Sequence, residues 1–226
     1  MDLKKIAIVV AGGTGQRMGS VVPKQFLEIE HKSILTHTID QFVAAFSSIE
    51  LVVVLPADYL EEGAAILNKS QYKNKISFVA GGDTRFQSVK NGLTKVEAPS
   101  IVFVHDAVRC LLTPALIQRC YQQAIEKGSA IPAVTATDTV RFMKGETHQL
   151  LDRENVMLIQ TPQTFRSELL LKAFEQEYQA SFTDEANVVE VSGVPVYLVD
   201  GEYENIKITR PLDLAIANYI LSKRFS

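Results

Sequence analysis

The chain has 226 residues, of which 46% are hydrophobic, and a formal net charge of −3. This length can bury one substantial core, so we expect a single domain over residues 1–226. The acidic balance, without any basic run, excludes an extended nucleic-acid-binding surface, so any anion site must be built locally. The apolar run after Lys4 and Lys5 is too short for a signal peptide or a membrane span, and we expect a cytoplasmic protein.

Short runs rich in β-branched residues alternate with helical patterns along the chain. Strands are predicted at Ile6–Val10, Leu51–Leu55, Ile76–Ala80, Ile101–His105, Ala130–Val134, Met157–Gln160 and Val196–Val199. Helices are predicted at Ser33–Phe46, Thr84–Val96, Pro114–Lys127, Ser167–Tyr178, Thr183–Ser192 and Pro211–Lys223. Continuous apolar runs fit parallel strands that are buried on both faces. The alternation predicts an α/β fold, a Rossmann-like three-layer sandwich with a mostly parallel twisted sheet, whose ligands bind beyond the carboxyl ends of the strands.

The first predicted strand leads into a glycine-rich loop, A-G-G-T-G-Q-R-M at residues 11–18, followed by Pro23-Lys24-Gln25. Glycines such as Gly13 and Gly15 let backbone N–H groups approach anionic oxygens. Arg17 and Lys24 place a cation on each side of the loop, which suits a polyphosphate on which charge builds up. The loop does not contain the P-loop pattern G-x-x-x-x-G-K-[ST]. It also departs from the dinucleotide pattern G-x-G-x-x-G, because Met18 replaces the last glycine. We interpret it as a phosphate-binding loop of a third kind.

A second candidate, Gly81–Ser88, follows a predicted strand and opens a helix. Asp83 or Thr84 can cap this helix. Gly81 and Gly82 leave room for a flat base, and Ser88 can reach toward it. This segment therefore predicts both a helix start and part of a nucleotide site.

A third candidate, His105-Asp106-Ala107-Val108-Arg109, follows the apolar strand residues Ile101–Val104. A carboxylate at the carboxyl end of a strand, close to a phosphate loop, is suited to bind Mg²⁺ or another divalent cation, and Asp106 is the metal ligand that we predict. Arg109 can face the same anions. His105 is interpreted as a structural hydrogen-bonding residue, since no second His or Cys stands at ligand spacing.

Residues 135–156 interrupt the alternation with a predicted hairpin, which turns at Lys144-Gly145. An isolated hairpin is marginally stable in water. From the residues alone, two alternatives stay open: a hairpin that lies over its own domain, or an arm that packs on a second subunit.

Two cations stand in later segments. Arg153 offers a bidentate fork for a phosphate, and Lys207 offers a movable point charge. Between them lies Gln160-Thr161-Pro162-Gln163, which follows a predicted strand.

The motifs A-G-G-x-G-x-R-M, P-K-Q, H-D-A-x-R, D-R, T-P-Q and N-I-K-I-T occur here in family order, and together they resemble the 2-C-methyl-D-erythritol 4-phosphate cytidylyltransferases of the non-mevalonate isoprenoid pathway. The family's H-D-A-x-R-P departs here at Cys110, which replaces the proline. The resemblance implies transfer of CMP from CTP to a sugar-alcohol phosphate, with Mg²⁺ and a homodimer that exchanges its arms. It implies several groups of site residues, as follows. The nucleotide is bound by Ala11, Gly12, Gly13, Gly15, Gly82, Asp83, Ser88 and Ala107; substrate is bound by Asp106, Arg109, Thr139, Thr161 and Thr183; the catalytic cations are Arg17, Lys24, Arg153 and Lys207.

The reaction that this resemblance implies needs no strong general base, because a phosphate nucleophile is already ionised at neutral pH. Its barrier is the meeting of two anions, which positioning and preorganised positive charge lower. Three alternatives stay open: a ribitol-5-phosphate cytidylyltransferase, a uridylyl- or guanylyltransferase, and a nucleotide-binding subunit without chemistry. Thr183-Asp184-Glu185-Ala186 and the Thr-Arg-Pro after Lys207 favour the erythritol enzyme over the ribitol enzyme.

Overall fold

A computed structural model describes residues 3–12, 22–67 and 72–224. Its central sheet has the strand order β10-β7-β11-β6-β1-β4-β5, and β12 pairs with β7. The strands of this sheet are β1 (Lys4–Val10), β4 (Glu50–Leu55), β5 (Ile76–Ala80), β6 (Ser100–Asp106), β7 (Ser129–Thr135), β10 (Met157–Ile159), β11 (Gln163–Arg166) and β12 (Leu198–Asp200). Parallel pairs join β1 to β4 and β6, β4 to β5, and β12 to β7, whereas β10 and β11 are antiparallel to their neighbours. The predicted mostly parallel sheet is confirmed.

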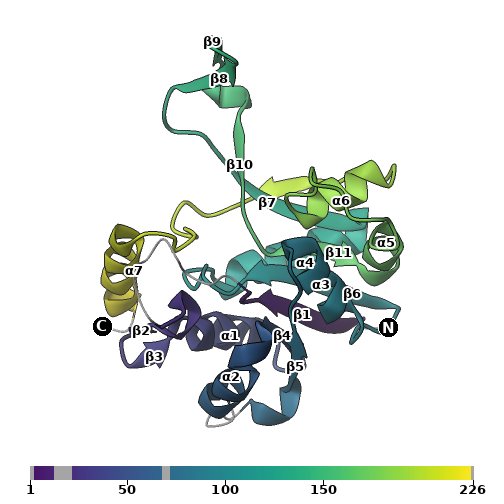
Figure 1. The fold of residues 1–226 in the computed structure, drawn as a ribbon, viewed down its shortest axis with the longest axis vertical. Helices are drawn as coiled ribbons and strands as arrows, with labels where there is room; N and C mark the ends of the chain where they lie inside the picture. The colour runs from purple at the N-terminus through teal and green to yellow at the C-terminus, as the bar shows by residue number, and fades with distance from the viewer. Residues whose placement is uncertain (1–2, 13–21, 68–71, 225–226) are drawn as a thin grey trace.

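Helices cover both faces of the sheet, which gives the predicted three layers (Figure 1). The helices are α1 (Ile34–Ala45), α2 (Leu60–Leu67), α3 (Arg85–Leu93), α4 (Pro114–Lys127), α5 (Ser167–Ala173), α6 (Glu185–Val191) and α7 (Pro211–Arg224). Along β1, Ala7 and Val9 belong to the apolar cluster beneath α1 and α4, whereas Ile6 and Ile8 belong to the cluster beneath α3, α5 and α6. Successive side chains of a strand point to opposite faces, so a strand covered on both sides is apolar throughout.

Side-chain caps begin three of the helices, and the predicted cap at Thr84 is confirmed. The side chains of Ser33, Thr84 and Thr113 accept hydrogen bonds from backbone N–H groups in the first turns of α1, α3 and α4. Each cap satisfies one of the N–H groups that a helix start leaves without a partner. Gly128 ends α4 with a φ of 91°, a conformation that glycine adopts without strain. The starts of α1, α3 and α4 are therefore set by the local sequence.

Some elements differ from the predictions. Helix α2 was not predicted. Strand β11 was not predicted either, because Gln163–Arg166 holds one large apolar residue and shows no apolar run. Strand β10 is shorter than expected, antiparallel and exposed, rather than buried and parallel. Helix α5 ends at Ala173 instead of Tyr178, and Phe174 turns into the core. The last strand begins two residues later than predicted, at Leu198.

The hairpin of strands β8 (Val140–Lys144) and β9 (Thr147–Leu151) projects from the body of the molecule (Figure 1). The two strands pair with each other in a separate two-stranded sheet. Phe142, Met143 and Leu150 are more than half exposed, at 57%, 61% and 57%. The hairpin therefore does not lie over its own domain, and the first of the two alternatives is wrong.

Across the described ranges, helices are too short or too polar to cross a membrane.

Candidate active site

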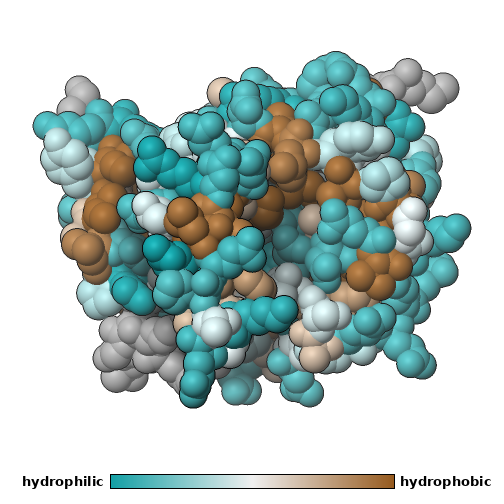
Figure 2. Space-filling model, turned by 90° about the horizontal axis from the view of Figure 1, so that it is seen from above, coloured by the Kyte–Doolittle hydropathy of each residue, from teal (hydrophilic) through white to brown (hydrophobic). Residues whose placement is uncertain are grey.

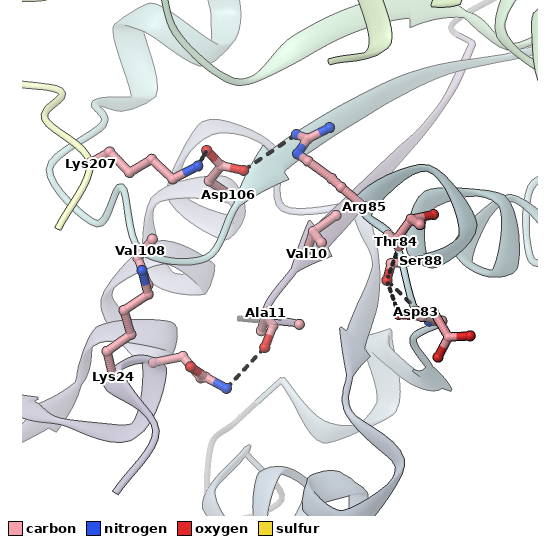
Figure 3. A pocket seen from close by; sticks show the side chains of 13 residues that line it. Val10, Ala11, Lys24, Asp83, Thr84, Arg85, Ser88, Asp106, Val108 and Lys207 are labelled. Atoms are coloured by element: carbon pink, nitrogen blue, oxygen red, sulfur yellow. Dashed lines mark hydrogen bonds and ion pairs between the residues drawn. The ribbon is translucent and has the colours of Figure 1, made fainter. Parts of the chain in front are cut away.

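A cavity of about 300 Å³ opens beyond the carboxyl ends of the central strands, as the fold class predicts. Figure 3 shows the side chains that line it. They come from the ends of β1 and β6, the start of α3, and the segments around residues 24 and 207. The described lining residues are Val10, Ala11, Gly12, Lys24, Gln25, Gly82, Asp83, Thr84, Arg85, Ser88, Asp106, Val108 and Lys207. Segments that are far apart in the sequence thus supply one site.

The P-K-Q segment is fixed to the end of β1 by its glutamine. Gln25 is 1% exposed, and its amide donates to the carbonyl oxygen of Ala11 over 2.9 Å. The neighbouring Lys24 Nζ lies 3.3 Å from the carbonyl oxygen of Ile208, in the segment that carries Lys207. The hydrogen bond of Gln25 therefore places Lys24 beside the strand end where the glycine-rich loop begins. Arg17, Gly13 and Gly15 lie outside the described residues.

The predicted base-binding segment converges on the hydroxyl group of Ser88. Its Oγ accepts from the backbone N–H of Gly82 over 3.1 Å and donates to the carbonyl oxygen of Thr84 over 2.9 Å. A Cβ atom at Gly12 would lie 3.6 Å from the same Oγ, so the end of β1 and the start of α3 meet there. The structure thus brings together Ala11, Gly12, Gly82, Asp83 and Ser88. Ala107 is fully buried and does not line the cavity.

Asp106 lies at the end of β6 and is surrounded by cations. Lys207 Nζ lies 2.9 Å and Arg109 Nε 3.6 Å from its Oδ2, and Arg85 Nη2 lies 3.3 Å from its Oδ1. Lys207 and Arg85 approach the carboxylate from opposite sides (Figure 3). Burial alone would raise the pKa of Asp106, but the three cations together lower it well below its usual range. Asp106 is therefore ionised at neutral pH.

Two residues of this cluster were not predicted as site residues. Arg85 is the first residue of α3, and its Nη1 donates to Oε1 of Glu185, the first residue of α6. Burial raises the pKa of the Glu185 carboxyl, and the charge of Arg85 opposes that rise. An acid directly after the Asp184 cap resembles an ordinary dipole-stabilising residue, which hides its role in the sequence. The signal that could have found Arg85 was its place at the start of α3, within the Gly81–Ser88 segment that was predicted to contribute to the nucleotide site.

Hydrogen bonds tie the loop after β6 to two other loops. The Thr161 hydroxyl accepts from the N–H of Asp106 over 3.1 Å and lies 3.0 Å from His105 Nδ1. His105 Nε2 lies 3.3 Å from the carbonyl oxygen of Arg109, which can only accept. Burial lowers the pKa of His105 to about 3, so the ring is neutral, with its proton on Nε2. Nδ1 therefore accepts from Thr161, and the structural role predicted for His105 is confirmed.

Asn205 completes this network from the third loop. Its side-chain Nδ2 donates to the carbonyl oxygen of Thr161 over 2.9 Å, and its backbone carbonyl oxygen accepts from Arg109 Nη1 over 2.8 Å. The loop that carries Lys207 is thereby joined to the loop that carries Asp106. We refer to these contacts among His105, Asp106, Arg109, Thr161 and Asn205 as the loop network.

Three predicted site residues, Thr139, Arg153 and Thr183, lie away from the cavity within this chain. Thr139 and Arg153 are exposed on the arm, where Arg153 donates to the carbonyl oxygen of Thr137. Thr183 is exposed beside a small pocket that it shares with Arg85 and Glu185. Their roles stay predictions.

An α/β sandwich of this kind, with glycines and a serine at one end of a strand-end cavity and a cation cluster at the other, is typical of nucleotidyltransferases. Comparison with known proteins places the chain within that class. The model of the family described as IspD, 2-C-methyl-D-erythritol 4-phosphate cytidylyltransferase, matches residues 5–223. The chain belongs to this family.

Relatives of the same name extend along the whole chain. The 2-C-methyl-D-erythritol 4-phosphate cytidylyltransferase of Bacteroides thetaiotaomicron is 42% identical over 219 residues, which cover 97% of this chain and 100% of the relative. The crystal structure of 4-diphosphocytidyl-2C-methyl-D-erythritol synthase from Anaerococcus prevotii has a TM-score of 0.82 at 29% identity, covering 97% of this chain and 99% of that chain. The cytidylyltransferase of Thermus thermophilus has a TM-score of 0.75 at 31% identity, covering 98% and 100%.

Proposed function

We propose that the chain transfers CMP from CTP to the phosphate of 2-C-methyl-D-erythritol 4-phosphate and releases pyrophosphate. The observation that carries this proposal is that one cavity, in a chain of the cytidylyltransferase family, is lined both by the glycine and serine segment and by the Asp106 cluster. Gly12, Gly82 and Ser88 line one part of the cavity, where a pyrimidine base would bind. Asp106 and its cations form another part, where phosphates would meet.

The acceptor phosphate is already an anion at neutral pH, so its oxygen can attack the α-phosphorus without a general base. One P–O bond forms to the acceptor while the bond to pyrophosphate breaks in line with it. The main requirement is that two anions be held together, which fixed positive charge achieves. Lys24 and Arg17 would stabilise the charge on the α-phosphate, and Lys207 and Arg153 would orient the acceptor phosphate.

Lys207 is suited to such a role because its position is set before substrate arrives. Its Nζ pairs with Asp106, while 42% of the side chain stays exposed. The pair leaves two protons of the ammonium group for an incoming phosphate. Because two arginines also contact Asp106, the cluster stays positive after that carboxylate is counted.

A divalent cation would enter this site with the nucleotide. The described residues contain no group of three or more His, Cys, Asp or Glu side chains that could hold a metal ion alone. Magnesium, however, is commonly bound by one or two carboxylates together with substrate phosphates. Asp106 is the carboxylate that we assign to it, and the bound cation would offset phosphate charge during transfer. The three neighbouring cations keep Asp106 ionised and in place for this contact.

We further propose that the arm packs on a second copy of the chain. Figure 2 looks onto the face from which the arm rises, and apolar side chains appear there in several patches. Phe142, Met143 and Leu150 on the arm itself are exposed, and a lone hairpin is marginally stable. Exchange of arms in a two-fold dimer would carry Thr139 and Arg153 to the partner's cavity.

A mixture of two inactive variants tests the exchange. In dimers formed from Lys24→Ala and Arg153→Ala chains, one site would combine an intact Lys24 with an intact Arg153 from the other chain. Random mixing should then restore about a quarter of the wild-type activity. No recovery after confirmed subunit exchange would place Arg153 in the site of its own chain, and a fully active monomer in sedimentation would contradict the dimer.

The function itself is tested by magnesium-dependent pyrophosphate release from CTP. Release with methylerythritol phosphate but not with ribitol 5-phosphate is the expected result. Release with ribitol 5-phosphate alone would keep the nucleotide site and change the acceptor.

We place the enzyme in the cytoplasm, which suits the two buried free thiols, Cys110 and Cys120.

A further inference from the structure

Glu185 is a buried carboxylate that lies behind the cavity and does not line it. It begins α6 and is 1% exposed. Its Oε1 accepts from Arg85, whereas its Oε2 is buried without a hydrogen-bond partner among the described residues. A helix start needs no buried charge, and an ionised carboxylate in the interior costs several kcal/mol unless it is paired. The position of Glu185 therefore calls for an explanation beyond the start of α6.

Arg85 joins this carboxylate to the site. One guanidinium nitrogen, Nη1, contacts Glu185, and the other, Nη2, lies 3.3 Å from Asp106 Oδ1. The guanidinium group is planar, so a contact at each of two nitrogens fixes both its place and its orientation. Figure 3 shows the Arg85 side chain extending from the start of α3 toward Asp106. Glu185 thus restrains Arg85 from the side away from the cavity.

The contacts of Asp106 show why this restraint matters. Lys207 and Arg109 both pair with Oδ2. Among the ion pairs of the described residues, Arg85 provides the one at Oδ1. Rotation of the carboxylate about its Cβ–Cγ bond is therefore limited by Arg85, and Arg85 is in turn held by Glu185.

We propose that Glu185 is a positioning residue for the transfer reaction, and that it acts through Arg85 to set the orientation of the Asp106 carboxylate. The proposal rests on the function proposed above. It assigns to α6 a part in catalysis without contact between Glu185 and substrate. It also separates two consequences of losing Glu185: a loss of kcat that passes through Arg85, and a loss of packing at the start of α6 that does not.

A double-mutant cycle with Glu185→Met and Arg85→Met tests the proposal. Methionine keeps the length and helix preference of Glu185 and removes its acceptor oxygens. We expect Glu185→Met to lower kcat on the order of 10-fold, the lower end of what loss of a supporting contact costs, with KM for both substrates within about twofold. In the Arg85→Met background the same change should alter kcat by less than about twofold, because the pathway through Arg85 is already lost.

Two further variants complete the experiment. Glu185→Gln keeps an acceptor oxygen for Arg85 and should recover most of the lost kcat. Glu190→Met, an exposed position on the same helix, is the matched control and should leave kcat unchanged. Equal losses from Glu185→Met in both backgrounds would show a merely structural role and overturn the proposal, as would full activity of Glu185→Met.

If Glu185→Met does not fold, Arg85→Lys decides the question. Lysine keeps a positive charge against Glu185, but one ammonium group cannot reproduce the two-sided fork of arginine. We expect a similar loss, on the order of 10-fold in kcat. Undiminished activity would overturn the proposal. An inactive wild-type enzyme, by contrast, would refute the proposed function, so the two failures are distinguishable.

Discussion

Replacing Thr161 by valine tests the loop network, because valine has nearly the same shape but no hydroxyl group. The hydroxyl accepts from Asp106 N–H over 3.1 Å and donates to His105 Nδ1 over 3.0 Å, and Thr161 is 5% exposed. The substitution leaves two buried polar groups without partners, at about 1–3 kcal/mol each. We therefore expect the free energy of unfolding to fall by roughly 2–6 kcal/mol, a large part of the roughly 5–15 kcal/mol that stabilises a domain.

Urea unfolding of the wild type and three variants measures this effect. Thr161→Ser keeps the hydroxyl and should lose much less stability than Thr161→Val. Thr164→Val is the matched control: it is the same substitution at a fully buried threonine whose hydroxyl donates over 3.3 Å to the carbonyl oxygen of Pro162. We expect it to lose about 1 kcal/mol. A loss below about 0.5 kcal/mol in Thr161→Val, the size of an ordinary surface change, would refute the network.

The same variants distinguish the loop network from direct binding of the acceptor by Thr161. The one proton of the hydroxyl is used at His105, so it is not available to an acceptor phosphate. Loss of the network should lower kcat because the Asp106 loop moves, with a smaller change in the KM for the acceptor. A raised acceptor KM at unchanged kcat and unchanged stability would instead make Thr161 a direct ligand.

Three shorter predictions concern other parts of the site. Lys24→Ala should lower kcat on the order of 10²–10³-fold with the fold intact by circular dichroism, and near-normal turnover would remove Lys24 from the catalytic residues. Gln25→Ala leaves the carbonyl oxygen of Ala11 without its partner and should cost about 1–3 kcal/mol in urea unfolding. The pKa of His105 falls from 6.5 to about 3 on folding, so between these pH values the unfolded chain binds one proton more than the folded chain. The free energy of unfolding should therefore decrease as the pH drops from about 6.5, by up to about 1.4 kcal/mol per pH unit. The lowered pKa of Asp106 adds acid sensitivity only below about pH 4. A free energy of unfolding that stays constant between pH 6.5 and 5 would therefore contradict a neutral His105. The control is His148→Asn on the exposed arm, which should keep the pH dependence of the wild type.

The central fold could be predicted because its strands are buried on both faces. Ile6–Val10 and Leu51–Leu55 read as continuous apolar runs for that reason, and the caps at Ser33, Thr84 and Thr113 mark the helix starts. Strand β11 has no such signal, since its residues Gln163–Arg166 are polar apart from Phe165. Its pairing with β6 and β7 is a tertiary contact that local sequence does not encode.

The candidate site was predictable wherever a functional side chain follows a strand directly. Asp106 and the segment from Gly82 to Ser88 are of this kind, and the structure brings them to one cavity. Arg85 and Glu185 were missed because their function depends on contact across 100 residues of sequence. The hydrogen bonds of Thr161 were missed for the same reason, since a threonine before Pro162 resembles an ordinary loop residue.

The charges of the site fit a reaction between two anions that needs no general base. An ionised phosphate nucleophile requires positive charge that is already in place, yet several cations in one cavity repel one another in the absence of substrate. Asp106 reduces this repulsion, since Lys207, Arg109 and Arg85 all contact it. Glu185 does the same for Arg85 from behind. The two carboxylates thus hold the cations in position, and under the proposed function the phosphates of the substrates would meet cations that are already oriented.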